Sequence, residues 1–211
     1  MGNIVDDIRA NEDTFADRPF NEVDSLALAQ LSYARMPVNV PRLDAEATDV
    51  DLAMVGVRDL LRAECYDDMF GKVWSPSMNV DLLRAMCESP RWRDLRVGGY
   101  VDEFDPETTK QFSACVFDVG DGSSYVAFRG TDSTIVGWKE DFAMAFRRPV
   151  AAQESAARYL ADIAGRRDGP LMVGGHSKGG NLAVYAAANA PAAVQERLIA
   201  VFCHDGPGFD A

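Results

Sequence analysis

The sequence predicts an α/β fold: a mostly parallel sheet with helices on both faces, an antiparallel hairpin in front and a helical segment at the N-terminus. Strand-like and helix-like stretches alternate from residue 124 to residue 203, which is typical of a parallel sheet. The chain has 211 residues, of which 47% are hydrophobic, so one domain with a sizeable core is expected. We expect residues 1–97 to pack as a helical segment on an α/β core of residues 98–211, the two forming one structural unit.

Three helices are predicted in the N-terminal segment, after an irregular stretch over residues 1–20. Apolar residues recur at helical spacing over 21–34. Two further helices are expected at about 48–64 and 79–88. The first and third helices each begin with an asparagine, which is a good N-cap.

From residue 98 onward, short apolar runs separated by turns indicate the sheet. Gly120-Asp121-Gly122 is a strong hairpin signal between two of these runs. The run before it is apolar on both faces, so we expect it at the centre of the sheet. In chain order, strands are expected at residues 100–104, 110–119, 124–129, 171–173 and 197–203, and helices at 137–147, at 151–165 and on the alanine-rich stretch after Gly180.

The stretch from Pro170 to Ala190 passes from a short apolar run through a glycine-rich turn into a helix, with a serine at the turn. Gly175-x-Ser177-x-Gly179 fits the pattern of a serine nucleophile on a strained strand-to-helix turn. The flanking residues must be glycine, because a Cβ there would meet the adjacent strand or helix. The alternative is an ordinary glycine-rich turn in which Ser177 is the helix N-cap.

A second motif lies at the end of the strand expected at residues 124–129, which precedes the glycine-rich turn in the chain. Phe128-Arg129-Gly130-Thr131-Asp132-Ser133 is followed by Trp138-x-x-Asp141 and then by the motif Gly175-His176-Ser177-Lys178-Gly179-Gly180. Together they resemble the class 3 lipase branch of the α/β-hydrolases. The N-terminal stretches Phe20-Asn21-Glu22-Val23-Asp24 and Leu31-Ser32-Tyr33 are similar to uncharacterised bacterial proteins of that branch. The D-G-P-G loop after Cys203 is also similar to a loop of those lipases. The resemblance covers about residues 125–209 and implies an α/β-hydrolase-like fold.

The resemblance implies a serine hydrolase that acts on a carboxylester, lipid or thioester through an acyl-serine at Ser177. Thr131 and the backbone N–H of Lys178 would form the oxyanion hole, where one donor is worth on the order of 3 kcal/mol. The lysine side chain is expected to leave the first helical turn away from the serine Oγ, which argues against its use as a base.

Four neighbouring residues receive supporting roles. His176 cannot present its ring to the adjacent Ser177 and is expected to pack beside the site. Asp141 would buttress the Thr131 loop, and Asp132 would either orient Thr131 or cap its loop. Arg129 is expected to form a structural ion pair.

A serine hydrolase of this fold takes an acid and then a histidine after the serine. After Ser177 the chain offers only Glu196, His204, Asp205 and Asp210. The glutamate lies at the wrong end of its strand, and the adjacent histidine and aspartate should point to opposite sides. We therefore expect the acid and base to lie beyond residue 211, and the hydrolase core to be C-terminally incomplete and inactive by itself.

Two classes of function remain open at this point. The first is the hydrolase, or an acyltransferase with the same chemistry, acting on a small-molecule ester or lipid, with residues 137–147 as a possible lid. The second is a non-catalytic module that uses the same scaffold to bind a ligand or partner. No cofactor and no metal are expected for either.

The composition restricts partners and location. A net charge of −12 argues against nucleic acid and anionic membranes as partners. No apolar run is long enough to span a membrane, and the acidic N-terminus does not resemble a signal peptide. The four cysteines are far apart, as expected for buried free thiols in a reducing compartment, so a cytoplasmic protein is predicted. The sequence does not determine the oligomeric state.

Overall fold

The computed structural model describes residues 2–44, 52–105, 107, 110–131 and 149–209. Within these residues a six-stranded sheet has the strand order β1 to β6 along the chain. The three pairings from β1 to β4 are antiparallel, and those of β4 with β5 and β5 with β6 are parallel. The α/β class is confirmed, but the sheet is mixed rather than mostly parallel. The strands are Met54–Gly56 (β1), Arg96–Asp105 (β2), Lys110–Asp118 (β3), Ser124–Phe128 (β4), Leu171–His176 (β5) and Leu198–His204 (β6).

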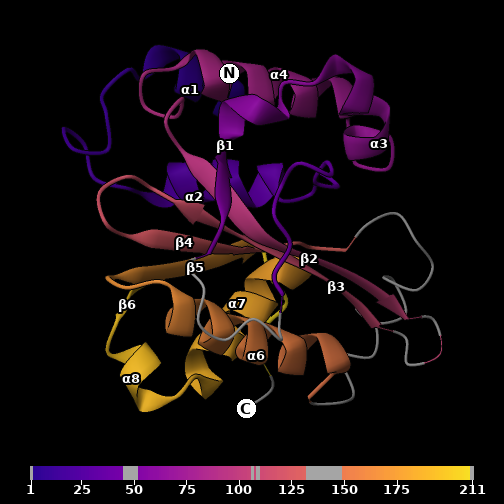
Figure 1. Ribbon diagram of the computed structural model, residues 1–211, viewed down its shortest axis with the longest axis vertical. Helices are drawn as coiled ribbons and strands as arrows, with labels where there is room; N and C mark the ends of the chain where they lie inside the picture. Colours follow the sequence, from indigo (N-terminus) through magenta and orange to yellow (C-terminus); the bar gives the residue numbers. More distant parts are fainter. Residues whose placement is uncertain (1, 45–51, 106, 108–109, 132–148, 210–211) are drawn as a thin grey trace.

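Helices cover both faces of the sheet (Figure 1). On one face, α2 (Glu22–Leu31) lies directly on the strands, and α1 (Ile4–Ala10), α3 (Tyr66–Phe70) and α4 (Pro76–Glu88) lie beyond it. On the other face lie α6 (Ala151–Arg166), α7 (Lys178–Asn189) and α8 (Ala192–Gln195). Each face has its own hydrophobic cluster, with Leu28 and Tyr125 in the first and Phe128 and Leu160 in the second.

The first helix corrects the expectation that residues 1–20 are irregular. Asn3 accepts hydrogen bonds from the backbone N–H groups of Val5 and Asp6, and the Asp6 side chain accepts one from the Asn3 N–H. The same reciprocal box, Asn21 with Asp24, begins α2 and confirms the predicted start of that helix.

The prediction of a helix over residues 48–64 is wrong for residues 52–64, the part of this range that the structure describes. Residues 54–56 form β1, followed by the 3₁₀ turns Val57–Leu60 and Ala63–Cys65. β1 pairs with residues 96–98, about forty positions along the chain, and this tertiary pairing decides the conformation of the segment.

Helix α4 ends at Glu88 as predicted but begins at Pro76, so Asn79 is not its N-cap. Proline suits the first turn because its missing N–H would have no partner there. Asn79 is buried inside the helix, where its amide donates to the carbonyls of Trp74 and Ser75 and accepts from Gln30.

The core elements after residue 98 agree with the predicted order, including the hairpin between β3 and β4. The helix or lid expected at residues 137–147 lies outside the described residues. The boundary expected between residues 97 and 98, which divides the N-terminal helical segment from the α/β core, stays a prediction.

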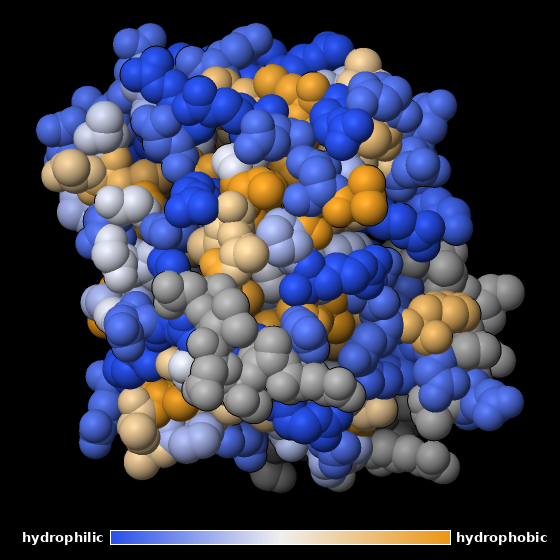
Figure 2. All heavy atoms as spheres, in the orientation of Figure 1, coloured by the Kyte–Doolittle hydropathy of each residue, from blue (hydrophilic) through white to orange (hydrophobic). Residues whose placement is uncertain are grey.

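Hydrophilic residues dominate the face seen in Figure 2, in keeping with the net charge of −12. Among the described helices, none combines the length and hydropathy needed to cross a bilayer.

Candidate functional site

Ser177 stands on a sharp turn between the end of β5 and the start of α7. Its φ of 56° and ψ of −128° form a backbone conformation that residues other than glycine rarely adopt. The turn is fixed by the Ser177 N–H, which donates to the His204 carbonyl at 2.8 Å. Within the described part of the chain its Oγ makes no hydrogen bond, so the side chain does not cap α7. Ser177 is half-buried at this turn.

The two glycines of the motif are needed for close packing, as predicted. A Cβ on Gly175 would lie 2.5 Å from the Phe128 carbonyl oxygen. A Cβ on Gly179 would lie 2.9 Å from the carbonyl carbon of the same residue and closer still to its oxygen. The start of α7 thus packs directly on the backbone at the end of β4.

Thr131 follows Gly130, which brings the end of β4 against the Ser177 turn. A Cβ on Gly130 would lie 2.6 Å from the His176 carbonyl oxygen. Thr131 is half-buried one residue further on. Its predicted role at the site stays a prediction.

The Lys178 side chain points away from the turn. It is 1% exposed, and its Nζ donates to the Gln111 carbonyl at 2.9 Å. This agrees with the expectation that the ammonium group does not act on the Ser177 Oγ. It instead joins α7 to β3.

The side chains of His176 and His204 lie on the face of the sheet that α2 covers, whereas α7 covers the other face. Each histidine contacts a hydroxyl group of α2 or of the residues that follow it. His176 Nδ1 is 2.9 Å from the Tyr33 hydroxyl, and His204 Nε2 is 2.9 Å from Ser25 Oγ. Ser25 Oγ also contacts the Tyr125 hydroxyl at 2.8 Å. No sequence pattern pointed to Ser25 or Tyr33 as contacts of the histidines, although both lie within the predicted first helix, residues 21–34.

The histidines belong to a polar row that crosses five strands. Asp102 lies opposite Ser113, the Arg129 N–H donates to the Ser113 carbonyl, and His176 lies beside His204. Because Phe128 is aligned with Gly175, Arg129 lies beside His176. The predicted ion pair of Arg129 is present, with its guanidinium 2.8 Å from the Asp102 carboxylate. Helix α2 and the residues after it thus cover a polar strip near the carboxyl ends of β4, β5 and β6, with contacts from Ser25, Tyr33 and Arg35.

Burial lowers the pKa of His204, and the neighbouring His176 lowers it further, while Glu22 opposes this. A lowered folded-state pKa means that the unfolded chain takes up the proton first as the pH falls. We expect the free energy of unfolding to fall as the pH drops below about 6.5 and on through the folded pKa.

Denaturant unfolding from about pH 7.5 down to about pH 5.5 checks this expectation, with His204→Gln as the comparison. Glutamine can still bind Ser25 but does not titrate, so the variant should lose less stability over this range. Parallel stability curves for the two proteins would contradict it.

The remaining predicted residues are not brought together at the turn. Glu196 follows α8 and precedes β6, at the end of the strand away from the site. Asp205 has a φ of 52° directly after β6, where it begins the loop whose Pro207 carbonyl accepts a hydrogen bond from Asn181. Asp132, Asp141 and Asp210 lie outside the described residues. No group of three or more potential metal ligands is found in the described part.

A family described as Mbeg1-like matches residues 86–211, which is more than half of the chain and includes β2 to β6. The chain belongs to the Mbeg1-like family. No curated protein and no solved structure matches it.

Membership of the Mbeg1-like family corrects three predictions. The class 3 lipase assignment, the lipase-type serine-hydrolase function and the esterase class of enzyme are wrong. The two motifs behind them are short, and what they specify locally is a tight strand-to-helix turn packed on its neighbouring strand. That geometry is present in this Mbeg1-like chain, and by itself it does not carry a reaction.

Proposed function

We propose that the protein is a non-catalytic binding module that receives the carboxylate of a small molecule at the turn between β5 and α7. The observation that carries the proposal is the Ser177 hydroxyl. It is half-buried, makes no hydrogen bond within the described residues and stands at the N-terminus of a twelve-residue helix. A helix N-terminus favours negative charge, and a serine hydroxyl can donate to a carboxylate oxygen.

The position of the turn supports binding at this place. Ligands of open α/β sheets bind outside the carboxyl ends of the strands, and the ends of β4, β5 and β6 meet here. The predicted contributions of Thr131 and the Lys178 backbone N–H belong to this proposal as groups that would contact the carboxylate.

Neither His176 nor His204 is placed to act as a base on the Ser177 hydroxyl. An acyl-transfer reaction needs a base within hydrogen-bond reach of the serine. His176 and His204, the two histidines of this sequence, contact Tyr33 and Ser25 on the α2 side of the sheet. The Ser177 turn packs with α7 on the opposite face.

Titration calorimetry with octanoate tests the proposal, with Ser177→Asp as the decisive variant. Aspartate would place a carboxylate at the helix N-terminus, where it stabilises the helix and competes with the ligand. We expect octanoate to bind the unaltered protein and to bind the variant at least about tenfold more weakly. Methyl octanoate, which lacks the charge, should bind the unaltered protein weakly.

Ser177→Gly is the matched control. It relieves the unusual backbone conformation and keeps the helix N-terminus, so it should bind octanoate only about fivefold more weakly through loss of one hydrogen bond. Equal affinities for octanoate in all three proteins would rule the site out. Hydrolysis of methyl octanoate, or a covalent adduct of a fluorophosphonate with Ser177, would show a nucleophile and overturn the non-catalytic proposal.

We also propose a reducing, cytoplasmic location. All four cysteines are free, and burial raises the pKa of Cys115 to about 12 and that of Cys87 to about 11. Only Cys115 is fully buried, and Cys203 is exposed, so the expected burial of all four thiols is wrong. An exposed thiol without a disulfide partner supports a compartment in which thiols stay reduced.

A further inference from the structure

Two buried amide side chains, Gln153 of α6 and Asn181 of α7, connect three elements beside the Ser177 turn. Gln153 Nε2 donates to Asn181 Oδ1 at 2.9 Å, and Asn181 Nδ2 donates to the Pro207 carbonyl at 3.0 Å. At the other end, the N–H of Val150, the residue that precedes α6, donates to Gln153 Oε1 at 3.0 Å. We call Gln153 and Asn181 the amide relay.

The direction of every hydrogen bond in the amide relay is fixed by its two backbone ends. A backbone N–H can only donate, and a backbone carbonyl can only accept. Gln153 must therefore turn its side-chain oxygen to Val150 and its amino group to Asn181. Asn181 must then direct its own amino group to Pro207. A change at either amide leaves buried polar groups of its neighbours without partners, which is costly.

The amide relay ends on the loop that follows β6, and this loop packs beside the Ser177 turn. The Ser177 N–H donates to the carbonyl of His204, the last residue of β6. A Cβ on Gly206 would lie 2.9 Å from the Asn181 backbone nitrogen. Residues 205–208 therefore lie against the first turn of α7, on the β6 side of the Ser177 turn.

We propose that Gln153 and Asn181 are positioning residues, which hold residues 205–208 as one wall of the carboxylate site at Ser177 and thereby set its affinity. The identity of the ligand rests on the function proposed above. The loop lies outside the carboxyl end of β6, where ligands of open α/β sheets bind. A wall that is already held in place loses less conformational freedom on binding than a free loop does, so the ligand binds more tightly.

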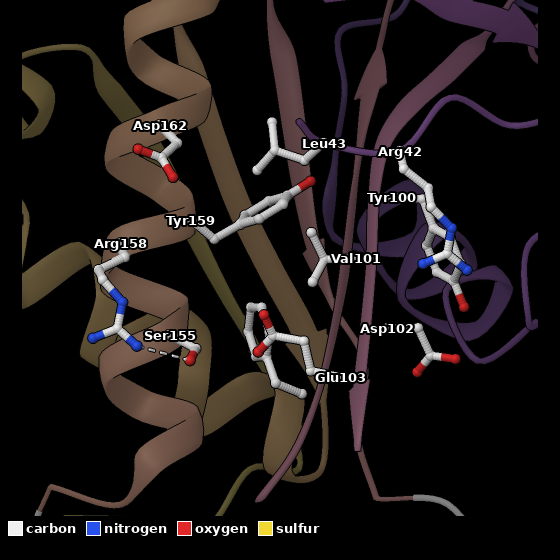
Figure 3. Close-up of a pocket in the computed structure, with 11 residues that line it drawn as sticks. Arg42, Leu43, Tyr100, Val101, Asp102, Glu103, Ser155, Arg158, Tyr159 and Asp162 are labelled. Carbon is white, nitrogen blue, oxygen red and sulfur yellow. Dashed lines mark hydrogen bonds between the residues drawn. The ribbon is translucent and has the colours of Figure 1, made fainter. Parts of the chain in front are cut away.

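Another side of α6 faces a cavity and provides a control. Ser155 and Arg158 line a cavity of about 410 Å³ between α6 and β2, and Arg158 Nη2 donates to Ser155 Oγ there (Figure 3). Gln153, two positions before Ser155, instead contacts α7. Ser155→Ala therefore removes a hydrogen bond from the same part of α6 and leaves the amide relay intact.

Nuclear magnetic resonance relaxation and octanoate titration together test the proposal. Asn181→Leu removes the side-chain hydrogen bonds at a similar volume and without a change of charge. We expect the backbone order parameters of Gly206 and Gly208 to fall from about 0.85 to below about 0.6. Octanoate should bind this variant about tenfold more weakly. Gln153→Met keeps the bond to Pro207 and should cause smaller changes of the same kind, and it serves as the test if Asn181→Leu does not fold.

Asn79→Leu is the matched control for Asn181→Leu. Asn79 is an equally buried asparagine in α4, whose amide also donates to a backbone carbonyl, that of Trp74, and accepts from a glutamine, Gln30. The two variants should lose similar stability. In folded Asn79→Leu and in Ser155→Ala, however, the loop after β6 should stay ordered and the octanoate affinity should not change.

An ordered loop in both Asn181→Leu and Gln153→Met would overturn the proposal, whether or not octanoate binds. A disordered loop with an unchanged octanoate affinity would show that the loop is no wall of the site and would also overturn it. If the unaltered chain does not bind octanoate, the proposed function fails, and the order of the loop in the variants still decides whether the amide relay holds it.

Discussion

Arg91→Met should lower the free energy of unfolding by about 3–5 kcal/mol. The Arg91 side chain is 1% exposed and pairs with the Asp24 carboxylate, which is 3% exposed. Two hydrogen bonds of 2.9 and 2.5 Å join the two groups. Methionine retains much of the packing volume but leaves the buried carboxylate without its counter-charge, and this uncompensated charge accounts for the expected loss.

Arg91 also holds the chain before α2 in place. Its guanidinium donates to four backbone carbonyls and lies 4.0 Å from the centre of the Phe15 ring. The carbonyls belong to Asp13, Thr14, Arg18 and Pro19. We therefore expect Arg91→Met to increase proteolysis within residues 13–19 as well as to lower stability.

Urea unfolding followed by circular dichroism measures the effect of Arg91→Met, and Arg84→Met is its matched control. Arg84 and Asp81 form a pair of 3.8 Å in which both side chains are about half exposed. Exposed pairs contribute roughly 0–1 kcal/mol, so the control should change little. Similar losses in the two variants would contradict a special role for the buried pair.

The sequence predicted the parts of the fold whose causes are local. The glycine turn around Ser177 and the hairpin at Gly120 require particular residue types at particular positions, and both are present as expected. The capping box that begins α1 is equally local, with Asn3 followed three residues later by Asp6, and could have been recognised. By contrast, β1 exists because residues 54–56 pair with a distant strand, and their own pattern did not reveal this.

The candidate site was predictable only in part for the same reason. The motif placed Ser177 at the carboxyl edge of the sheet, and the reasoning on side-chain direction kept Lys178 and His176 away from its hydroxyl. The contacts from Ser25 and Tyr33 to the histidines depend on how α2 packs across the sheet, which no local pattern specifies. The family assignment went wrong because two short motifs define a turn and its packing, and these do not define a reaction.

Gly179→Ala should destabilise the protein by about 3 kcal/mol and disrupt the Ser177 turn. A Cβ at this position would lie 2.9 Å from the Phe128 carbonyl carbon and 3.0 Å from that of Arg129. These are backbone atoms of a strand that pairs on both sides, so they cannot move aside as a flexible side chain would. The start of α7 must then shift away from β4 and carry Ser177 with it.

Gly165→Ala is the control for Gly179→Ala, since the same methyl group at Gly165 in α6 would meet no atom within 4 Å. Alanine favours the helix by about 0.5–1 kcal/mol there, so this variant should be slightly stabilised. Urea unfolding measures both changes, and octanoate titration of folded Gly179→Ala should show weakened binding if the turn has moved. A Gly179→Ala protein as stable as the unaltered chain would mean that α7 does not pack on β4 as closely as described.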